Sequence, residues 1–405
     1  MLPERIRRLQ VEIAGTARGQ LLRHSVYEFR YLDTDIAQPS LALLMPPQTP
    51  TYQDADLFAV LGQNLPEGDL FMRLRQLYPK QLLSAMHLLA LVGRNGIGRL
   101  GFGQADQAPP AAPALMSRQA LLATRCTPKV FDDLVQAYLS TGAGIAGMQP
   151  KIMVPDRPTI PIPTLIVKAG PEAYPGLAAN EFLCLTAARH AGILTPGFDL
   201  SDDGQLLVID RFDIDEQGQR MGFEDIASLM GLRVRDVLSD RKYQSSCARI
   251  ADVLKMLRLP AENLARFFEQ VAFTVMVRNG DGHLKNYGVL NRDETDIRLA
   301  PMFDVVTTAI YRCTRCNGGP ELEDRTMALK LFGGRHQGKG YPGVDELLRF
   351  GREVCGVAQP ARVLQRLAQG MSQALASASG DPRIPPVTRA AMAEFWQLGL
   401  AYAVG

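Results

Sequence analysis

The hydrophobic pattern of this sequence changes its period near Ser245. Over residues 5–50, apolar and polar residues alternate in short runs that are broken by residues such as Gly15, Gly19 and Pro39, which is typical of short strands joined in hairpins. After Ser245, apolar residues recur every three or four positions over long stretches, which indicates amphipathic helices. The two patterns together predict an α+β fold with a β-rich N-terminal region and an all-helical C-terminal lobe.

The same patterns predict individual elements. Before residue 115 we expect hairpin strands over 5–50, a helix over 54–78 that is interrupted at "NLPEGD", a helix over 81–91, and a Pro/Ala-rich linker over 104–114. The next part predicts a helix over 129–139, strands at "KIMVP" and "TLIVKAG", a helix over 178–190 and a strand at "QLLVIDRFD". Beyond Ser245 we expect helices over 246–258, 261–278, 344–354, 360–379 and 386–403. These elements predict three domains, at 1–105, 114–243 and 244–405.

Composition narrows the class of protein. The chain of 405 residues is 46% hydrophobic and has 44 basic against 42 acidic residues, so charge alone points to neither nucleic acid nor an anionic membrane. The N-terminus lacks the apolar core of a signal peptide, and the most apolar stretch, 82–93, is too short to cross a bilayer. Six scattered cysteines fit reduced thiols rather than a disulfide framework. We therefore expect a soluble cytoplasmic protein with no membrane partner.

One polar cluster stands directly behind the helix predicted over 261–278. In that helix an apolar stripe recurs at helical spacing and is formed by Leu264, Phe267, Phe268, Val271 and Val275. Gly280 is expected to end the helix, so the following loop has a rigid support, as catalytic side chains need.

The cluster itself consists of Asp281, His283, Lys285 and Asn286. Asp281 and Asn286 have the D-x-x-x-x-N spacing of a protein-kinase catalytic loop, in which the Asp accepts the proton of the substrate hydroxyl and the Asn binds magnesium. Lys285 would compensate charge on a transferred phosphoryl group. The alternative is a loop with an Asp-Gly turn and a buried, hydrogen-bonded His283, because so short a pattern also occurs by accident.

Asp304 is a second candidate metal ligand. It follows the predicted strand in "IRLAPMFDVVTT", after a hairpin that begins at Tyr287. Asp304 and Asn286 supply the oxygen ligands that Mg²⁺ prefers, and nucleotide phosphates and waters would complete its octahedron. A strand followed by an Asp is also common in a purely structural role.

A glycine-rich segment precedes the cluster in the sequence. Gly142, Gly144 and Gly147 form G-x-G-x-x-G, but an apolar strand follows them rather than the helix of a dinucleotide-binding fold. The strand "LIVKAG" then brings Lys168, and a flexible glycine loop followed by a strand lysine is the order in which protein kinases hold nucleotide phosphates. The alternative is a plain glycine loop with a lysine at a strand end.

Two further features fall in the same order. Glu181, near the start of the helix over 178–190, could pair with Lys168, although surface ion pairs of this kind are common. The predicted strand 207–213 lies where an interlobe hinge would hold an adenine by main-chain hydrogen bonds. The alternative is that Asp210 and Asp213 are solvated acidic residues at a strand end. We interpret Cys313 and Cys316 as two free thiols rather than a zinc site, because no second pair of cysteines and no pair of histidines stands at the spacing of zinc ligands. The shared order favours phosphoryl transfer over each separate alternative.

The sequence resembles the HipA-like serine/threonine kinases, which are toxins of bacterial toxin–antitoxin pairs. The residues that carry the resemblance are "GIAGMQPK" (144–151), "LIVKAG" (165–170), "NEFLCLTAARHAGI" (180–193), "VIDRFD" (208–213), "NGDGHLKNYGV" (279–289) and "LAPMFDV" (299–305). The N-terminal part with "LGQNLPEGD" also resembles the first subdomain of the family.

The resemblance implies a two-lobed protein-kinase-like fold. Residues 1–105 would be the HipA N-terminal-type subdomain, 114–243 the N-lobe and 244–405 the C-lobe. It implies ATP and Mg²⁺ as cofactors, Asp281 as the catalytic base, and Asn286 and Asp304 as metal ligands. Lys168 would contact the ATP phosphates. The hinge for adenine would consist of Asp210, Arg211 and Phe212.

The resemblance also implies partners. The protein substrate would be an aminoacyl-tRNA synthetase or another translation factor, whose phosphorylation inhibits growth, and the partner would be a helix-turn-helix antitoxin, with no direct nucleic-acid binding by this chain. One position departs from the family: Gly144 stands where a serine is autophosphorylated in the best-known members. Such self-inactivation should therefore be absent, or moved to Ser140 or Thr141.

Two other functions remain open at this point. One is an ATP-binding regulatory module without transfer activity that acts through an antitoxin-like DNA-binding partner, although such a module has no need of a base at Asp281. The other is a metal-dependent nuclease or phosphohydrolase, which would need neither the glycine loop nor Lys168.

Overall fold

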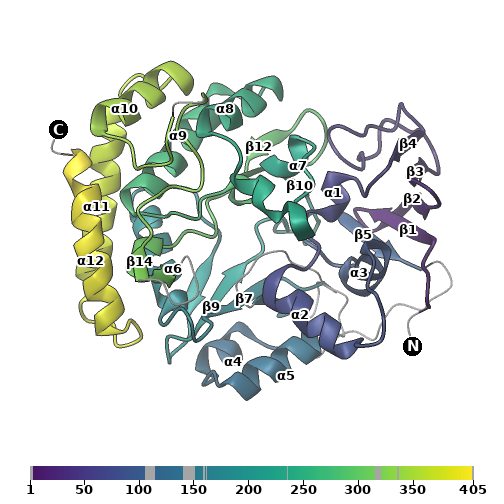
Figure 1. Cartoon of the computed structure of the whole chain (residues 1–405), viewed down its shortest axis with the longest axis horizontal. Helices are drawn as coiled ribbons and strands as arrows, with labels where there is room; N and C mark the ends of the chain where they lie inside the picture. The colour runs from purple at the N-terminus through teal and green to yellow at the C-terminus, as the bar shows by residue number, and fades with distance from the viewer. Residues whose placement is uncertain are drawn as a thin grey trace. The chain divides into compact units, whose positions relative to one another are not determined.

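The structure is a computed structural model, and it describes residues 3–104, 115–139, 151–157, 160, 162–234, 236–314, 321–334 and 337–403. The predicted glycine loop and nearly all of the predicted linker lie outside these residues. The chain divides into two compact units. Figure 1 labels the helices and strands. Unit 1 comprises Met1–Ala169, Val208–Arg241 and Gly288–Ile297, and unit 2 comprises Gly170–Leu207, Lys242–Tyr287 and Arg298–Gly405. The three continuous domains drawn from the sequence stay a prediction.

Unit 1 begins with an antiparallel sheet of five strands in the order β4-β3-β2-β1-β5. The strands are β1 (Arg8–Ile13), β2 (Thr16–Arg23), β3 (Tyr27–Tyr31), β4 (Thr51–Asp54) and β5 (Leu100–Gly103). In β1 every second residue, Leu9, Val11 and Ile13, is buried, so one face of the sheet forms a core. The hairpin strands predicted over 5–50 are confirmed.

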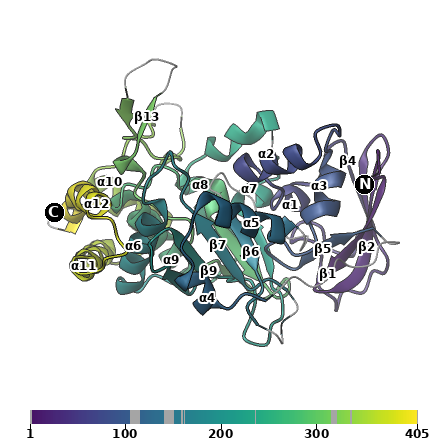
Figure 2. The ribbon, with the colours of Figure 1, turned by 90° about the horizontal axis from the view of Figure 1, so that it is seen from below.

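Three helices follow β4 in the sequence, α1 (Ala59–Gly62), α2 (Gly68–Leu77) and α3 (Ala85–Val92). Helix α3 packs on the sheet and contributes Met86, Leu89 and Val92 to its core (Figure 2). It begins later than predicted because the hydroxyl of Ser84 accepts the main-chain N–H of His87 and caps the helix there.

The rest of unit 1 contributes strands to two smaller sheets. Its elements are α4 (Arg118–Ala123), α5 (Pro128–Leu139), β6 (Lys151–Val154), β7 (Leu165–Ala169), β10 (Gly222–Asp225), α7 (Ile226–Leu229) and β11 (Gly288–Asn291). The strand orders are β6-β7-β9-β8 and β10-β11-β12. The division between the units passes through β9 (Leu206–Asp210) and β12 (Ile297–Leu299), and β8 (Phe198–Leu200) belongs to unit 2. The predicted strands at "KIMVP", "TLIVKAG" and "QLLVIDRFD" are confirmed.

Unit 2 is mainly helical, as the change of period near Ser245 predicts. Its helices are α6 (Leu177–His190), α8 (Cys247–Met256), α9 (Ala261–Met276), α10 (Val344–Arg349), α11 (Pro360–Ala378) and α12 (Pro386–Leu400). One turn of π-helix continues α10 over Phe350–Val354, so the helix predicted over 344–354 is present with a change of winding. A short hairpin of β13 (Arg312–Thr314) and β14 (Glu321–Glu323) adds strands to a region that the sequence predicts as all-helical.

Two glycines let the helices of unit 2 approach closely. A Cβ at Gly370 of α11 would lie 2.6 Å from the main-chain nitrogen of Ala191, which follows α6. A Cβ at Gly399 of α12 would lie 2.0 Å from the carbonyl oxygen of Met276, the last residue of α9. Figure 2 shows α11 and α12 end-on and side by side. The end of α9 is therefore held by direct contact with α12.

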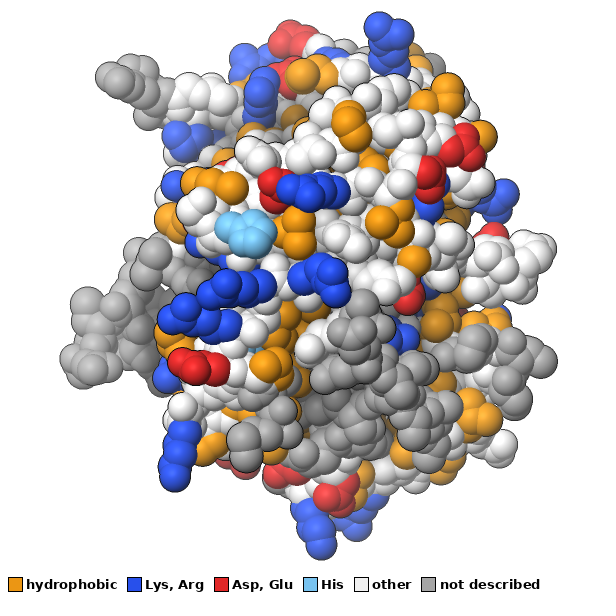
Figure 3. Space-filling model, turned by 90° about the vertical axis from the view of Figure 1, so that its right-hand side faces the viewer, with side chains coloured by type: hydrophobic (Ala, Val, Ile, Leu, Met, Phe, Trp, Pro, Cys, Tyr) orange, Lys and Arg blue, Asp and Glu red, His pale blue; other side chains and the backbone are white. Residues whose placement is uncertain are grey.

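Charges of both signs are mixed on the face drawn in Figure 3. Lys and Arg side chains lie there with Asp and Glu side chains among them. This mixture agrees with the near balance of 44 basic and 42 acidic residues in the chain.

Candidate active site

The loop with the polar cluster begins where α9 ends. The helix is anchored by Phe267, Phe268, Val271 and Val275, all 0% exposed, which confirms four of the five positions of the predicted stripe. Its first member, Leu264, is only half-buried. The turn is made at Arg278, whose φ of 57° is left-handed, and the N–H of Asn279 donates to the carbonyl of Thr274 over 3.0 Å. This is the usual C-terminal turn of a helix with an arginine in place of glycine. The prediction that Gly280 ends the helix is therefore wrong.

Gly280 has a different part in the loop. A Cβ at this position would lie 2.4 Å from a carboxylate oxygen of Asp324 and 2.7 Å from the carbonyl oxygen of Thr326. Its N–H donates to the hydroxyl of Thr308 over 2.6 Å, and that hydroxyl donates to the carbonyl of Arg278 over 3.2 Å. Glycine is required here because the chain passes too close to its neighbours for any side chain.

Asp281 lies at the exposed tip of the loop. Its N–H donates to the side-chain oxygen of Asn279 over 3.0 Å, and its carbonyl accepts the N–H of His283 over 2.8 Å. The hydroxyl of Tyr243 donates to Oδ1 of Asp281 over 2.9 Å. The carboxylate is thus presented to solvent from a backbone that is held on both sides.

His283 is buried at 7% exposure behind this tip. Burial, followed by the positive charge of Lys242, lowers the pKa of His283 from 6.5 to about 3, so the imidazole is neutral at pH 7. A neutral ring in this position packs under the loop and adds no positive charge to it. Its assignment to the catalytic group stays a prediction.

Asn286 and Asp304 lie together. The amide Nδ2 of Asn286 donates to Oδ2 of Asp304 over 3.0 Å, and Oδ1 of Asn286 accepts the N–H of His283 over 3.2 Å. A carboxylate oxygen and an amide oxygen are hard donors that suit Mg²⁺. The amide oxygen of Asn286 would bind the ion through the lone pair that the N–H of His283 does not use. Among the residues that the structure describes, no three His, Cys, Asp or Glu side chains group as a metal site, so phosphates and water would have to supply the other ligands.

Asp304 does not stand at the end of a strand. Strand β12 stops at Leu299, and Asp304 follows in an irregular segment with a left-handed φ of 57°. The prediction of a strand that delivers Asp304 is corrected accordingly. Helix α9 holds the start of this segment, because Oδ1 of Asn263 accepts the N–H of Leu299 over 2.9 Å and Nε2 of Gln270 donates to the carbonyl of Ala300 over 3.0 Å.

The segment is also held after Asp304. The side chain of Asn180, from α6, accepts the N–H of Thr307 over 2.8 Å and donates to its carbonyl over 3.1 Å. The indole N–H of Trp396, from α12, donates to the hydroxyl of Thr307 over 2.8 Å. One helix, α9, therefore supports both the Asp281 loop and the segment that carries Asp304, and two further helices hold that segment in place.

Lys168 lies in β7 of unit 1 and is 4% exposed. Its antiparallel neighbour in β6 is Lys151, which is 7% exposed. Residues directly opposite in such a pair project from the same face of the sheet. Two buried lysines thus lie on one face of the sheet, an arrangement that suits a polyanion.

Glu181 belongs to α6 in unit 2 and is 0% exposed. It therefore is not the surface residue that the sequence suggests. Its predicted pairing with Lys168, which belongs to unit 1, stays a prediction.

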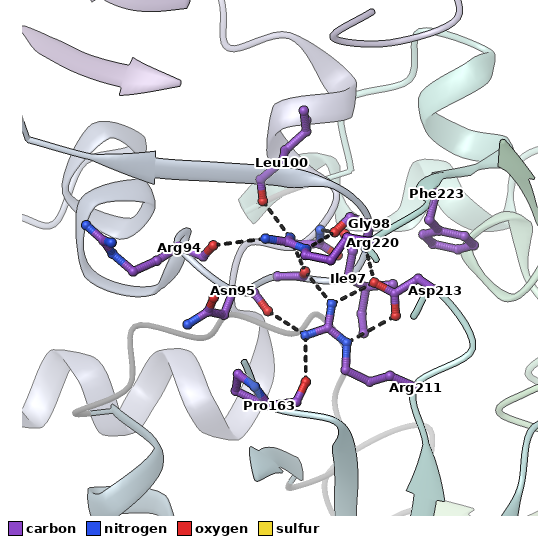
Figure 4. A network of polar contacts seen from close by, with 12 residues as sticks. Arg94, Asn95, Ile97, Gly98, Leu100, Pro163, Arg211, Asp213, Arg220 and Phe223 are labelled. Atoms are coloured by element: carbon purple, nitrogen blue, oxygen red, sulfur yellow. Dashed lines mark hydrogen bonds and ion pairs between the residues drawn. The ribbon is translucent and has the colours of Figure 1, made fainter. Parts of the chain in front are cut away.

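The predicted hinge residues begin at the end of β9. The guanidinium of Arg211 is buried and pairs with both carboxylate oxygens of Asp213, at 3.1 and 2.6 Å. It also donates to the carbonyls of Asn95, Gly96 and Pro163, while Arg220 donates to those of Gly98 and Leu100 (Figure 4). The side chains of Arg211 and Arg220 therefore hold the 94–100 segment together.

The main chain of the hinge is partly engaged as well. The N–H of Arg211 donates to the carbonyl of Thr164 over 2.9 Å, and Asp210 forms an ion pair with Arg118. The ring of Phe212 packs edge-on against that of Phe223, with centroids 5.3 Å apart. The assignment of Asp210, Arg211 and Phe212 to adenine stays a prediction, and for Arg211 only main-chain contact is compatible with its burial.

Sequence reasoning missed Tyr243, Thr308 and Lys151. No periodic signal marks Tyr243 or Thr308, which become partners of the loop only through folding. Lys151 is the last residue of "GIAGMQPK" and lies opposite Lys168 in the pair of β6 and β7. An antiparallel alignment of the two predicted strands would have identified it. Among the described residues, no helix has the length and apolar character to cross a membrane.

A solved structure of similar fold is HipA of Shewanella oneidensis MR-1, in a complex with HipB and operator DNA. The TM-score is 0.69 at 18% identity, and the likeness covers 98% of this chain and 96% of that chain. At this identity the likeness shows the fold, which is the α+β, protein-kinase-like fold of HipA, as the sequence predicts.

Family comparison agrees with the fold. Residues 143–378 match the HipA-like C-terminal domain, and residues 9–103 match the HipA N-terminal domain. The first match alone spans more than half of the sequence, and the chain belongs to the HipA-like family.

Two relatives come from Sinorhizobium fredii. "Putative kinase Y4dM" is 30% identical over 160 residues, which cover 36% of this chain and 38% of that protein. "Putative kinase Y4mE" is 25% identical over 356 residues, which cover 80% of this chain and 81% of that protein. The chain thus spans less than half of the first relative and most of the second.

Proposed function

We propose that this protein is an ATP- and Mg²⁺-dependent protein kinase of the HipA toxin type, which transfers the γ-phosphoryl group of ATP to a serine or threonine hydroxyl. The observation that carries the proposal is the arrangement on α9: exposed Asp281 on one loop, with Asn286 of that loop 3.0 Å from Asp304. A base and two oxygen donors on one rigid support are what phosphoryl transfer needs.

Each residue has a part in this reaction. The carboxylate of Asp281 accepts the proton of the attacking hydroxyl. Asn286 and Asp304 hold the metal ion, which when bound neutralises phosphate charge. Lys285 lies half-buried on the same loop and compensates charge as the phosphoryl group moves.

The residues proposed to bind the nucleotide lie between Gly142 and Phe212 in the sequence. Lys168 contacts the phosphates from β7, and the glycine segment with Gly142, Gly144 and Gly147 covers them in the order usual for kinases. Glu181 orients Lys168, and Asp210 to Phe212 border the adenine. His283 supports the loop as a neutral ring. These roles follow the family order and are proposals for this chain.

Partners are proposed from the same family. The Shewanella structure contains HipB and operator DNA, and we infer an antitoxin-like partner that binds operator DNA. This chain is expected to reach that DNA through the antitoxin rather than to bind it directly. The substrate is proposed to be a translation factor such as an aminoacyl-tRNA synthetase, with growth inhibition as the consequence and the cytoplasm as the location.

The decisive experiment is transfer of label from γ-labelled ATP with Mg²⁺ in a bacterial lysate, with the wild type compared with Asp281→Asn. A discrete labelled protein that is lost in the variant supports the kinase and provides its substrate for identification. Phosphoamino-acid analysis then tests the serine/threonine specificity. If neither protein labels anything while ATP raises the melting temperature of both, the chain is a regulatory ATP-binding module. Cleavage of nucleic acid without ATP would instead support a metal-dependent nuclease.

A further inference from the structure

Tyr243 is the last residue of a 3₁₀ segment, Asp236–Tyr243, that leads into α8. Its hydroxyl donates a hydrogen bond to Oδ1 of Asp281 over 2.9 Å. Tyr243 and Asp281 are 38 residues apart in the sequence, so no local pattern brings them together. The contact joins Tyr243 directly to the proposed base.

The ring of Tyr243 is held on one side by His283. The two rings meet edge to face with centroids 5.3 Å apart. His283 is only 7% exposed and is itself part of the loop that carries Asp281. The ring of Tyr243 therefore packs against the buried imidazole of His283.

The main chain of Tyr243 is held as well. Its carbonyl accepts a hydrogen bond from Nζ of Lys339 over 2.9 Å. The ammonium groups of Lys242 and Lys339 lie 5.2 and 5.8 Å from the centre of its ring, within the range of cation–π attraction. The hydroxyl is thus delivered from a side chain that is fixed at both ends.

A fixed donor matters because Asp281 is exposed. An exposed aspartate exchanges rotamers freely, whereas a base must face the attacking hydroxyl in one orientation. A donor that is fixed on Oδ1 limits the rotation of the carboxylate and so orients it towards the attacking hydroxyl.

We propose that Tyr243 is a positioning residue for the proposed base, Asp281. The inference rests on the proposed kinase function. Tyr243 acts through the carboxylate, and its hydroxyl stays on Oδ1 while the substrate hydroxyl is deprotonated.

The test is Tyr243→Phe, which keeps the ring on His283 and removes only the hydroxyl. Hydrogen bonds to charged groups are the strong ones, so we expect kcat to fall about tenfold to a hundredfold. The KM for ATP and the melting temperature should stay near their wild-type values. Tyr52→Phe is the matched control: it removes a hydroxyl that donates to the carbonyl of Pro46 over 2.7 Å in the N-terminal sheet. This control should transfer phosphate like the wild type.

Two outcomes overturn the inference while the kinase stands. One is an unchanged kcat in Tyr243→Phe. The other is a raised kcat, which would mean that the hydroxyl blocks the position of the acceptor. In both, the wild type is active and Asp281→Asn is inactive, so the proposed function survives.

A second measurement needs no turnover. In a double-mutant cycle of Tyr243→Phe and Asp281→Ala, the effects on the midpoint of denaturant unfolding should be non-additive, because the two residues are in contact. If the wild type transfers no phosphate the proposed function fails, and additive effects in the cycle would remove the contact on which the inference depends.

Discussion

The side-chain amide of Asn286 donates to the carboxylate of Asp304 over 3.0 Å, and these two residues come from segments that one helix, α9, supports. Their spacing is therefore a property of the fold rather than of either segment alone. If this pair binds Mg²⁺ as proposed, the affinity should depend on the charge of the Asp304 side chain. Small shifts of the Asp304 backbone should have little effect on it.

Asp304→Asn tests the metal site. Asn tolerates the left-handed φ of 57° at this position, so the variant should fold, while loss of the negative charge should remove most of the affinity for Mg²⁺. We expect the rise in melting temperature caused by MgATP to fall towards that caused by ATP with EDTA. An undiminished MgATP shift would show that Asp304 holds no metal. Asp252→Asn, on the exposed face of α8, is the control.

Lys151→Met tests the lysine pair. Lys151 is buried opposite Lys168, so the change removes one positive charge from the face of the sheet that carries Lys168. It should weaken ATP binding about tenfold, because a buried charge contact is lost. Isothermal titration with ATP measures this effect. Lys255→Met, exposed on α8, should leave ATP binding unchanged, and unaltered ATP binding in Lys151→Met would refute a contact with phosphate.

Asp213→Asn tests the buried network of Figure 4. Both partners of the Arg211–Asp213 pair are 0% exposed, so the variant leaves a buried guanidinium without its carboxylate. We expect a loss of about 3 kcal/mol in the free energy of unfolding. Chemical denaturation measures it. The exposed pair of Arg249 and Asp252 offers a comparison, since Asp252→Asn should cost less than about 1 kcal/mol.

His283 should make stability depend on pH in the acid range. Its folded pKa of about 3 lies below the ordinary 6.5, so the unfolded chain binds the extra proton between these values. Above pH 6.5 the ring is neutral in both the folded and the unfolded chain, so it does not change the free energy of unfolding. As the pH falls from 6.5 towards 3, the free energy of unfolding decreases by about 1.4 kcal/mol per pH unit. Between pH 7 and 4 the unfolding midpoint of the wild type should fall relative to that of His283→Phe, which has no group to protonate at this position. Parallel curves would mean that the ring titrates normally.

The titration of Glu224 should change the stability of the fold in the opposite direction, so that stability decreases as the pH rises. Burial raises the pKa of Glu224 from 4.5 to about 7, although the N–H of Leu43 and the charge of Arg99 oppose the rise. The folded state then holds a proton that the unfolded chain releases above pH 4.5, so this stabilisation is lost as the pH rises through 7. Glu224→Gln should flatten the fall in stability between pH 5 and 8. A fall as steep as that of the wild type would assign it to other groups.

Local patterns were enough for most elements. The apolar stripe of α9 and the alternation in β1 record which side of an element is buried, and burial follows a fixed period in helices and strands. The spacing of Asp281 and Asn286 likewise placed both residues on one loop. Helix ends were less predictable: α9 turns at Arg278, because contacts of its last turn outweigh the cost of a left-handed arginine.

The α+β class, the order of the elements, the family and the candidate reactive residues could be predicted from the sequence, because periodicity and short-range spacing indicate them. The contacts that those residues make became known from the folded structure. It placed the hydroxyl of Tyr243 on Asp281, set Lys151 beside Lys168 and enclosed the guanidinium of Arg211 among carbonyl groups. Such contacts join residues far apart in the chain, and their energy comes from burial and hydrogen bonds that exist only after packing, so no local pattern carries them.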